Sequence, residues 1–180
     1  KVLDYLIPDE HSMLEHSKRR YLKNAKSYQI FSREWSKRKH ILFWRGSTTG
    51  RQGKWIESIS DLRDLERVRA CIKFKDADGI DLRITKIVQN NLPKQIIKQW
   101  LDEKQIRARP VRHKEFSGYC YYLDIPGNAR AWGTIRKYTS GNLVFRPNSV
   151  YKLYYHKFMK PWVHYIPVEA DYRDIKEKYE

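Results

Sequence analysis

The sequence contains only two cysteines, Cys71 and Cys120, in 180 residues. Two cysteines do not form the disulfide framework that holds small secreted proteins together. Both have apolar neighbours, so we expect buried free thiols, which favours a reducing compartment. Apolar runs of the ~20 residues that span a bilayer are absent, and no secretory signal opens the chain. We therefore expect a cytoplasmic location, or a peripheral one on the inner face of a membrane, with the secretory-pathway lumen as the alternative.

The familiar catalytic and metal-binding patterns are also missing. The six histidines are scattered, and none stands with cysteines or carboxylates at the spacing of a metal site. The Gly-x-Ser-x-Gly turn of hydrolases does not occur, and no two carboxylates stand out as an acid and base pair. We expect no metal and no cofactor, and we identify no catalytic residue. The sequence thus indicates a domain that binds part of a substrate while another domain supplies the base.

The sequence has an excess of positive charge. Lys and Arg number 37 against 21 Asp and Glu, which gives a formal net charge of +16. Such a surplus attracts anions but does not choose among nucleic acid, an acidic membrane surface and a sugar diphosphate. Since no recognised RNA- or DNA-binding signature appears, a nucleic-acid-binding module without catalytic activity is the alternative function.

The apolar pattern changes near residue 40. Residues 1–40 are polar and basic, with an amphipathic pattern at 11–26 that suits an anionic membrane surface. From residue 41 onward, short apolar runs alternate with segments of helical spacing, such as 59–73. We interpret 1–40 as an inter-domain segment and 41–180 as a donor-binding domain.

This alternation of strand and helix predicts an α/β fold, a Rossmann-like parallel sheet with helices on both faces. The apolar runs expected to form its strands are residues 41–44, 120–125, 143–145 and 163–166. A further strand is expected near residues 80–87, and Pro93 is expected to open a helix.

A basic loop rich in hydroxyl groups follows the first expected strand. In open α/β sheets, ligands bind beyond the carboxyl ends of the strands. Glycines let the backbone approach a ligand closely, and arginines match phosphate oxygens with paired N–H groups. The residues expected to bind phosphate here are Arg45, Gly46, Ser47, Thr48, Gly50 and Arg51. An ordinary solvated loop is the alternative, and composition alone does not decide between the two.

A second strand-to-helix turn is expected at residues 122–131. The amides at a helix N-terminus receive phosphate readily. Gly127 would allow close approach of a ligand to the backbone, and Arg130 and Arg136 would add positive charge nearby. An ordinary connection between a strand and a helix is again the alternative.

Residues 151–168 interleave aromatic and basic side chains. Such a pattern can bind single-stranded nucleic acid by stacking and charge. Aromatic residues at this spacing more often build a hydrophobic core, and we favour that interpretation.

Several short blocks, taken in order, resemble glycosyltransferase family 90. Residues 44–50 resemble the Trp-Arg-Gly-Ser-x-Thr-Gly signature of that family, and residues 124–128 resemble its Asp-x-x-Gly-Asn turn. The other similar blocks are residues 7–9, 140–145 and 160–168. Each block is weakly specific, but their common order over residues 7–172 makes the resemblance fairly specific. The family includes capsule-associated and lipopolysaccharide-modifying enzymes and the protein O-glucosyltransferases.

The resemblance implies a two-domain GT-B architecture with a nucleotide-sugar donor in its cleft, a UDP-sugar in the best-understood members. It implies inverting transfer, without a required metal, to a hydroxyl of a glycan, lipopolysaccharide or protein acceptor. Arg45 would then grip the diphosphate beside Ser47 and Thr48. The residues that would wrap the nucleotide are Asn128, Ala129, Arg130, Ala131, Trp132 and Gly133.

Two departures from the family pattern matter. Many members carry an arginine where Gly133 stands, so Arg130 or Arg136 would have to replace its charge. The family's catalytic carboxylate lies well upstream of Arg45, so we expect the base outside this chain. We also expect both ends of the chain to be truncated relative to the full enzyme.

Our firmest expectation is that the loop after residue 44 and the turn at residues 127–131 meet at one edge of the sheet. We also expect Arg45→Ala to weaken binding of a UDP-sugar. It should barely change folding, because an exposed loop arginine contributes little to stability.

Overall fold

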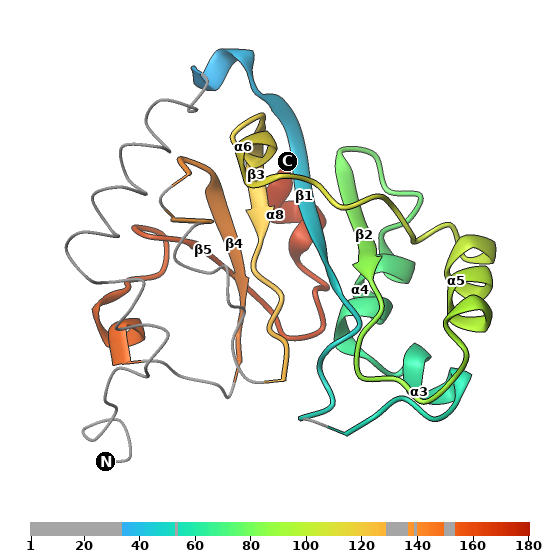
Figure 1. The fold of residues 1–180 in the computed structure, drawn as a ribbon. Helices are drawn as coiled ribbons and strands as arrows, with labels where there is room; N and C mark the ends of the chain where they lie inside the picture. Colours follow the sequence, from blue (N-terminus) through green and yellow to red (C-terminus); the bar gives the residue numbers. More distant parts are fainter. Residues whose placement is uncertain (1–33, 53, 129–136, 139, 150–153) are drawn as a thin grey trace, which may run out of the picture.

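The computed structural model describes residues 34–52, 54–128, 137–138, 140–149 and 154–180. These residues form a five-stranded, wholly parallel sheet in the order β2-β1-β3-β4-β5, with helices packed against it (Figure 1). The predicted α/β fold with a Rossmann-like sheet is therefore confirmed. The GT-B architecture and the division at residue 40 stay predictions.

Three of the four listed strands fall where the sequence predicts them, and so does the strand near residue 80. The strands are β1 (Lys39–Ser47), β2 (Ile80–Lys86), β3 (Tyr119–Leu123), β4 (Leu143–Pro147) and β5 (Ile166–Val168). The prediction of a strand at residues 163–166 is wrong at its start, because residues 162–164 form a turn and the strand begins at Ile166. The amide of Trp162 donates to the carbonyl of Tyr165, which closes this turn before the strand.

The helices between the strands are short. They are α3 (Ile59–Arg63), α4 (Glu66–Lys73), α5 (Lys94–Glu103), α6 (His113–Phe116) and α8 (Ile175–Tyr179), with 3-10 turns η2 (Trp35–Lys37) and η3 (Tyr154–Phe158). The helical pattern at 59–73 is divided in two because Leu65 adopts an extended backbone conformation. Pro93 is the N-cap of α5, so it opens that helix as predicted.

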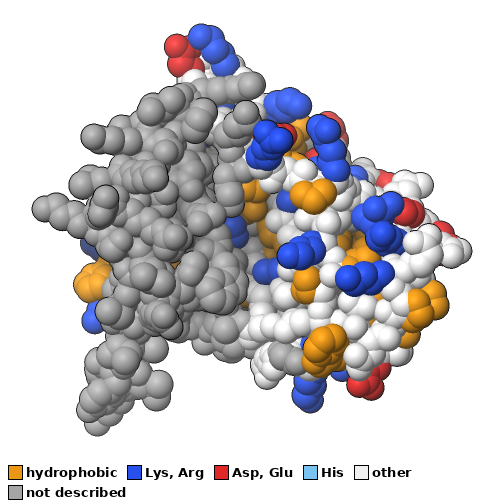
Figure 2. All heavy atoms as spheres, in the orientation of Figure 1, with side chains coloured by type: hydrophobic (Ala, Val, Ile, Leu, Met, Phe, Trp, Pro, Cys, Tyr) orange, Lys and Arg blue, Asp and Glu red, His pale blue; other side chains and the backbone are white. Residues whose placement is uncertain are grey.

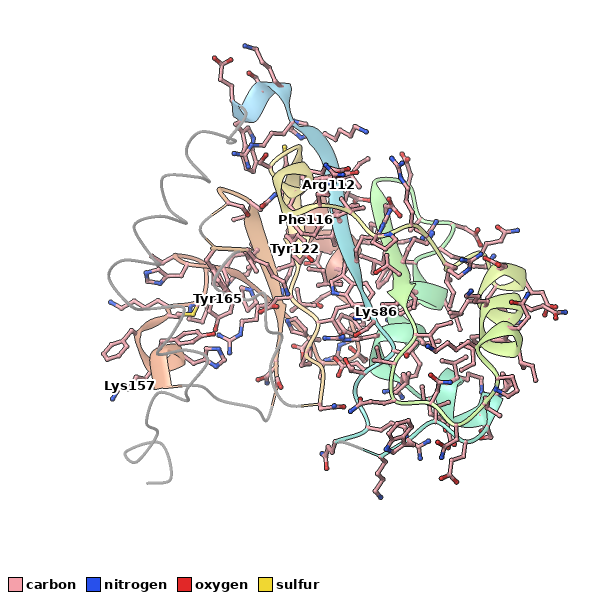
Figure 3. All side chains as sticks on the ribbon, in the orientation of Figure 1. Lys86, Arg112, Phe116, Tyr122, Lys157 and Tyr165 are labelled. Atoms are coloured by element: carbon pink, nitrogen blue, oxygen red, sulfur yellow. The ribbon has the colours of Figure 1, made fainter. Side chains whose placement is uncertain are left out.

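Helices cover both faces of the sheet. On one face, Trp44 of β1 packs under α4, and Tyr121 of β3 contacts Tyr179 of α8. On the other face, Tyr122 lies edge-on to Phe116 of α6, with ring centroids 5.4 Å apart (Figure 3). Neighbouring strand residues such as 121 and 122 point to opposite faces, so the alternating aromatic residues of β3 contribute to both layers of the core.

The strand order creates a switch point next to β1. The chain passes from β1 to β2 on one side and then returns to β3 on the other side. Phe43 pairs with Tyr122 across β1 and β3, so residues just after Ser47 and just after Leu123 leave the sheet at the same edge. Ligands of open α/β sheets bind in the crevice that forms at such a point.

The two cysteines are buried free thiols, as predicted. Within the described part of the chain, no helix is both long enough and apolar enough to cross a membrane. The basic segment at 11–26 lies outside the described residues. The predicted locations stay predictions.

Candidate functional site

The end of β1 differs from the predicted loop. Arg45, Gly46 and Ser47 are strand residues that pair with β2, so the loop begins at Thr48. Gly46 is required here for packing, and its predicted contact with a ligand stays a prediction. A Cβ at this position would lie 2.2 Å from Cζ2 of the Trp44 ring, which fills the core beneath the strand.

Arg45 lies on the face of the sheet and is paired with Asp81 of β2. Its Nη2 is 2.5 Å from Oδ2 and its Nη1 is 3.0 Å from Oδ1 of that carboxylate. Its guanidinium also lies 4.3 Å from the centre of the Phe43 ring. Only 11% of the side chain is exposed, so the expectation of an exposed loop arginine is wrong. The strand continues through Arg45 because β2 supplies a pairing partner.

The other predicted cation of the loop, Arg51, is also paired with a carboxylate. Its Nη1 lies 2.5 Å from Oδ1 of Asp61 in α3. A hydrogen bond from the amide of Glu57 and the neighbouring Arg51 hold the pKa of Asp61 below its usual value. Both arginines that the sequence singled out thus have their charge offset by aspartates.

Thr48 is buried, and its hydroxyl is engaged by Val88. The hydroxyl donates to the carbonyl of Val88 and accepts from its amide, both at 2.9 Å. This exchange ties the start of the loop to the segment after β2. Contact of Arg45 or Thr48 with a diphosphate stays a prediction, and it would require these present bonds to be exchanged.

The loop after β1 and the turn after β3 do lie side by side. The amide of Gly50 donates to Oδ1 of Asn128 at 3.0 Å, although the two residues are 78 positions apart. Nδ2 of Asn128 in turn donates to Gln89 at 2.9 Å. A Cβ on Gly127 would lie 3.0 Å from Oγ1 of Thr49. Gly127 therefore allows the loop to approach the turn closely, and the predicted approach of a ligand to its backbone stays a prediction.

A residue that the sequence did not single out, Arg67 of α4, joins the two segments. Its Nε donates to the carbonyl of Pro126 at 2.8 Å, and its Nη2 donates to the carbonyl of Ile125 at 3.3 Å. Its Nη1 donates to the hydroxyl of Thr49 at 2.5 Å and to the carbonyl of Ser47 at 3.2 Å. A guanidinium has five N–H donors, so one on Nη2 has no partner among the described residues.

The charge of Arg67 is buried without a carboxylate bonded to it among the described residues. Its exposed fraction is 7%, and burial lowers its pKa. Burying a charge without a bonded carboxylate is costly, and the carbonyls of Pro126, Ile125 and Ser47 offset part of that cost. A sequence signal for this residue does exist. Arg67 stands one turn before Cys71 and next to Val68, on the apolar side of its helix.

A buried ion pair supports the turn from the other side. Nζ of Lys137 contacts Oδ1 of Asp124, the residue that directly follows β3. Both side chains are nine-tenths buried or more. The amide of Asp124 also donates to Phe145 of β4 at 2.8 Å. This pair links the chain just after β3 with the segment that leads to β4.

Several predicted site residues lie outside the described residues: Ala129, Arg130, Ala131, Trp132, Gly133 and Arg136. Their predicted contacts with a nucleotide stay predictions. Among the described residues, no group of three or more His, Cys, Asp or Glu is arranged to hold a metal ion. Figure 2 shows Lys and Arg side chains spread over the described part of one face, with the acidic side chains seen there mainly toward its margin.

A sequence profile of glycosyl transferase family 90 matches residues 17–180. The chain belongs to this family. The family resemblance of the short sequence blocks is thereby confirmed. The parallel sheet and its switch point are consistent with that assignment.

The matched relatives include enzymes and viral proteins. An uncharacterized protein of Frog virus 3 is 29% identical over 163 residues, which cover 81% of this chain and 16% of the relative. Protein O-glucosyltransferase 1 of Rattus norvegicus is 25% identical over 79% of this chain and 32% of its own length. The O-glucosyltransferase rumi homolog of Aedes aegypti is 28% identical over 76% of this chain and 29% of its own length. The chain thus spans between 16% and 32% of the length of these relatives.

Proposed function

We propose that this chain is the donor-binding part of a glycosyltransferase and that it binds a UDP-sugar in the crevice between β1 and β3. The enzyme would transfer the sugar to a hydroxyl of a glycan, lipopolysaccharide or protein acceptor. The observation that carries the proposal is the buried guanidinium of Arg67, which lies at the switch point without a bonded carboxylate among the described residues.

A diphosphate fits the needs of this crevice. Guanidinium groups match phosphate oxygens with paired N–H donors, and Arg67 has a donor on Nη2 without a partner among the described residues. The hydroxyl of Ser47 and the backbone of the loop lie beside it. An anion in the crevice would offset the cost of burying the charge of Arg67.

The same arrangement supports the proposed chemistry. In an inverting transfer, the acceptor hydroxyl attacks the anomeric carbon from the side opposite the leaving nucleoside diphosphate. Negative charge grows on the departing phosphate, and a preorganised cation stabilises that charge. Arg67 would serve in this role, so the transfer would not require a metal ion. The base that accepts the hydroxyl proton would come from outside this chain.

Calorimetric titration of the full chain tests the proposal. UDP and UDP-glucose are expected to bind, with and without a metal chelator, and ADP is expected to bind more weakly. A twelve-nucleotide single-stranded RNA is the control for the alternative function, measured at two salt concentrations because such binding weakens with salt. Binding of the RNA without detectable binding of UDP would reject the proposal and favour a nucleic-acid-binding module.

A further inference from the structure

A second cavity lies at the same edge of the sheet, beyond the ends of β4 and β5. Its volume is about 530 Å³. Its wall includes Arg146, His156, Trp162, Tyr165 and Lys178. Tyr165 and the nearby Lys157 lie on the side of β4 away from β1 (Figure 3). Since strands are spaced ~4.8 Å apart, the pair of β4 and β5 lies about 10 Å along the sheet from the pair of β1 and β3.

Arg146 brings a positive charge to the cavity, and no salt bridge joins it to a carboxylate of the described residues, although Glu169 also lines the wall. Its Nη2 lies 2.7 Å from Nδ1 of His156, and its guanidinium lies 5.0 Å from the centre of the Tyr165 ring. An arginine only donates hydrogen bonds, so Nδ1 of His156 is the acceptor. Lys178 differs from Arg146, because its ammonium is paired with Asp174 at 2.5 Å.

Trp162 forms an aromatic wall at the mouth of the cavity. Its side chain is 66% exposed, although it is large and apolar. Its φ is 63°, a left-handed conformation that is uncommon for residues other than glycine and costs free energy. The hydrogen bond from its amide to Tyr165, at 2.8 Å, closes the turn that holds it there. Such strain persists mainly where a position serves a function.

The hydrogen-bonded turn therefore keeps the side chain of Trp162 exposed to solvent. The ammonium of Lys178 lies over the ring, 5.4 Å from its centre, and the residue as a whole stays 66% exposed. An open indole ring beside a cavity is an apolar surface on which the C–H face of a sugar ring can pack. The guanidinium of Arg146 can meet an acidic group on that sugar with paired N–H donors.

We propose that this cavity binds an acidic sugar unit of the acceptor glycan, one that carries a carboxylate or a phosphate group. Trp162 packs against the sugar ring, and Arg146 binds the acidic group. The site is distinct from the crevice of Arg67, and it lies close enough for one acceptor chain to reach both. The inference rests on the proposed function only in taking the acceptor to be a glycan.

Titration of the full chain with three probes tests this site. The probes are trigalacturonate, mannose 6-phosphate and the neutral trisaccharide maltotriose, with UDP measured in parallel. Arg146→Gln is expected to weaken binding of both acidic probes about tenfold or more. It is expected to change UDP affinity less than about twofold. Trp162→Ala is expected to weaken binding of the acidic and the neutral probes alike. The matched controls are Arg63→Gln and Trp55→Ala, which alter exposed side chains elsewhere.

The possible results separate this proposal from the donor site. If the wild-type chain binds neither acidic probe, or if Arg146→Gln binds them as well as wild type does, the inference is rejected. If Arg146→Gln weakens UDP as much as the acidic probes, the cavity belongs to the donor site and the inference is also rejected. Arg67→Met, which is expected to lose UDP but retain the acidic probes, shows separately whether the donor proposal fails.

Discussion

Nη1 of Arg67 lies 2.5 Å from Oγ1 of Thr49, a contact that joins helix α4 to the loop after β1. The same guanidinium holds the turn after β3 through Pro126 and Ile125. One side chain thus joins the loop after β1 to the turn after β3 at the switch point. Its removal should affect ligand binding and the geometry of both segments together.

Arg67→Met is expected to lower the affinity for UDP by about 10- to 100-fold, because a charge-assisted contact is lost. The free energy of unfolding is expected to fall by about 1–3 kcal/mol, since backbone carbonyls lose their donors. Calorimetry and urea unfolding measure the two effects. Arg69→Met, an exposed change on the same helix, is the control. Equal UDP affinity in the Arg67 variant and wild type would contradict the assignment.

Asp81→Asn replaces with an amide the only carboxylate that is bonded to Arg45 among the described residues. Because we place the ligand at Arg67, we expect UDP affinity to change less than about threefold in this variant. Arg45→Ala is expected to lower the free energy of unfolding by about 1–3 kcal/mol, since the partly buried pair is lost. A marked gain in UDP affinity in Asp81→Asn would show instead that Arg45 leaves its partner to grip the diphosphate.

Gly127→Ala inserts a methyl group 3.0 Å from both Nη2 of Arg67 and Oγ1 of Thr49. We expect it to destabilise the fold by about 1–2 kcal/mol through overpacking and to weaken UDP binding. In an Arg67→Ala background, the same change should cost much less, because one of the two crowding groups is gone. Thermal unfolding of the four proteins gives this coupling. Strict additivity would argue that the crowding does not decide the role of Gly127.

The buried pair of Asp124 and Lys137 gives a second double-mutant test. Lys137→Met alone is expected to destabilise the fold by about 3–5 kcal/mol, because it leaves a buried carboxylate unpaired. Asp124→Asn combined with Lys137→Met should be less destabilised than the sum of the two single changes. Urea unfolding at neutral pH measures all three variants. A double variant that unfolds as the sum predicts would show that the pair is not coupled.

Burial in the core raises the pKa of the Cys71 thiol to about 12. The folded chain therefore holds this proton where the unfolded chain, with an ordinary thiol pKa near 8.5, has lost it. The stability that the protonated Cys71 thiol contributes to the fold is fully present below the unfolded pKa. It is lost as pH rises toward the folded pKa of about 12. We expect Cys71→Ala to lose less stability than wild type between about pH 8.5 and pH 10.

A thiol-reactive disulfide reagent provides a second measurement on Cys71. The native thiol should react slowly at pH 8 and rapidly in denaturant, because the reactive species is the thiolate and the side chain is buried. Cys120→Ala isolates the signal of Cys71 and serves as the parent protein for both measurements. Rapid reaction of this parent protein under native conditions would contradict the predicted burial.

The sequence by itself determined the class of fold, because short apolar runs separated by helical patterns can be buried only in a layered parallel sheet. It also placed the strand ends closely enough to predict that the residues after β1 and β3 would meet. The residues 162–164 were misassigned because a turn closed by Trp162 and Tyr165 has the same apolar composition as a strand.

Only the tertiary structure decided which cations are bonded to a carboxylate. Arg45 and Arg51 stand in the sequence motif, yet Asp81 and Asp61 offset their charges, and neither partner is predictable from local pattern. Arg67 lies in an ordinary amphipathic helix, yet the packing of α4 brings it between β1 and β3 without a bonded carboxylate among the described residues. Charge compensation depends on contacts between distant segments, and local sequence does not specify those contacts.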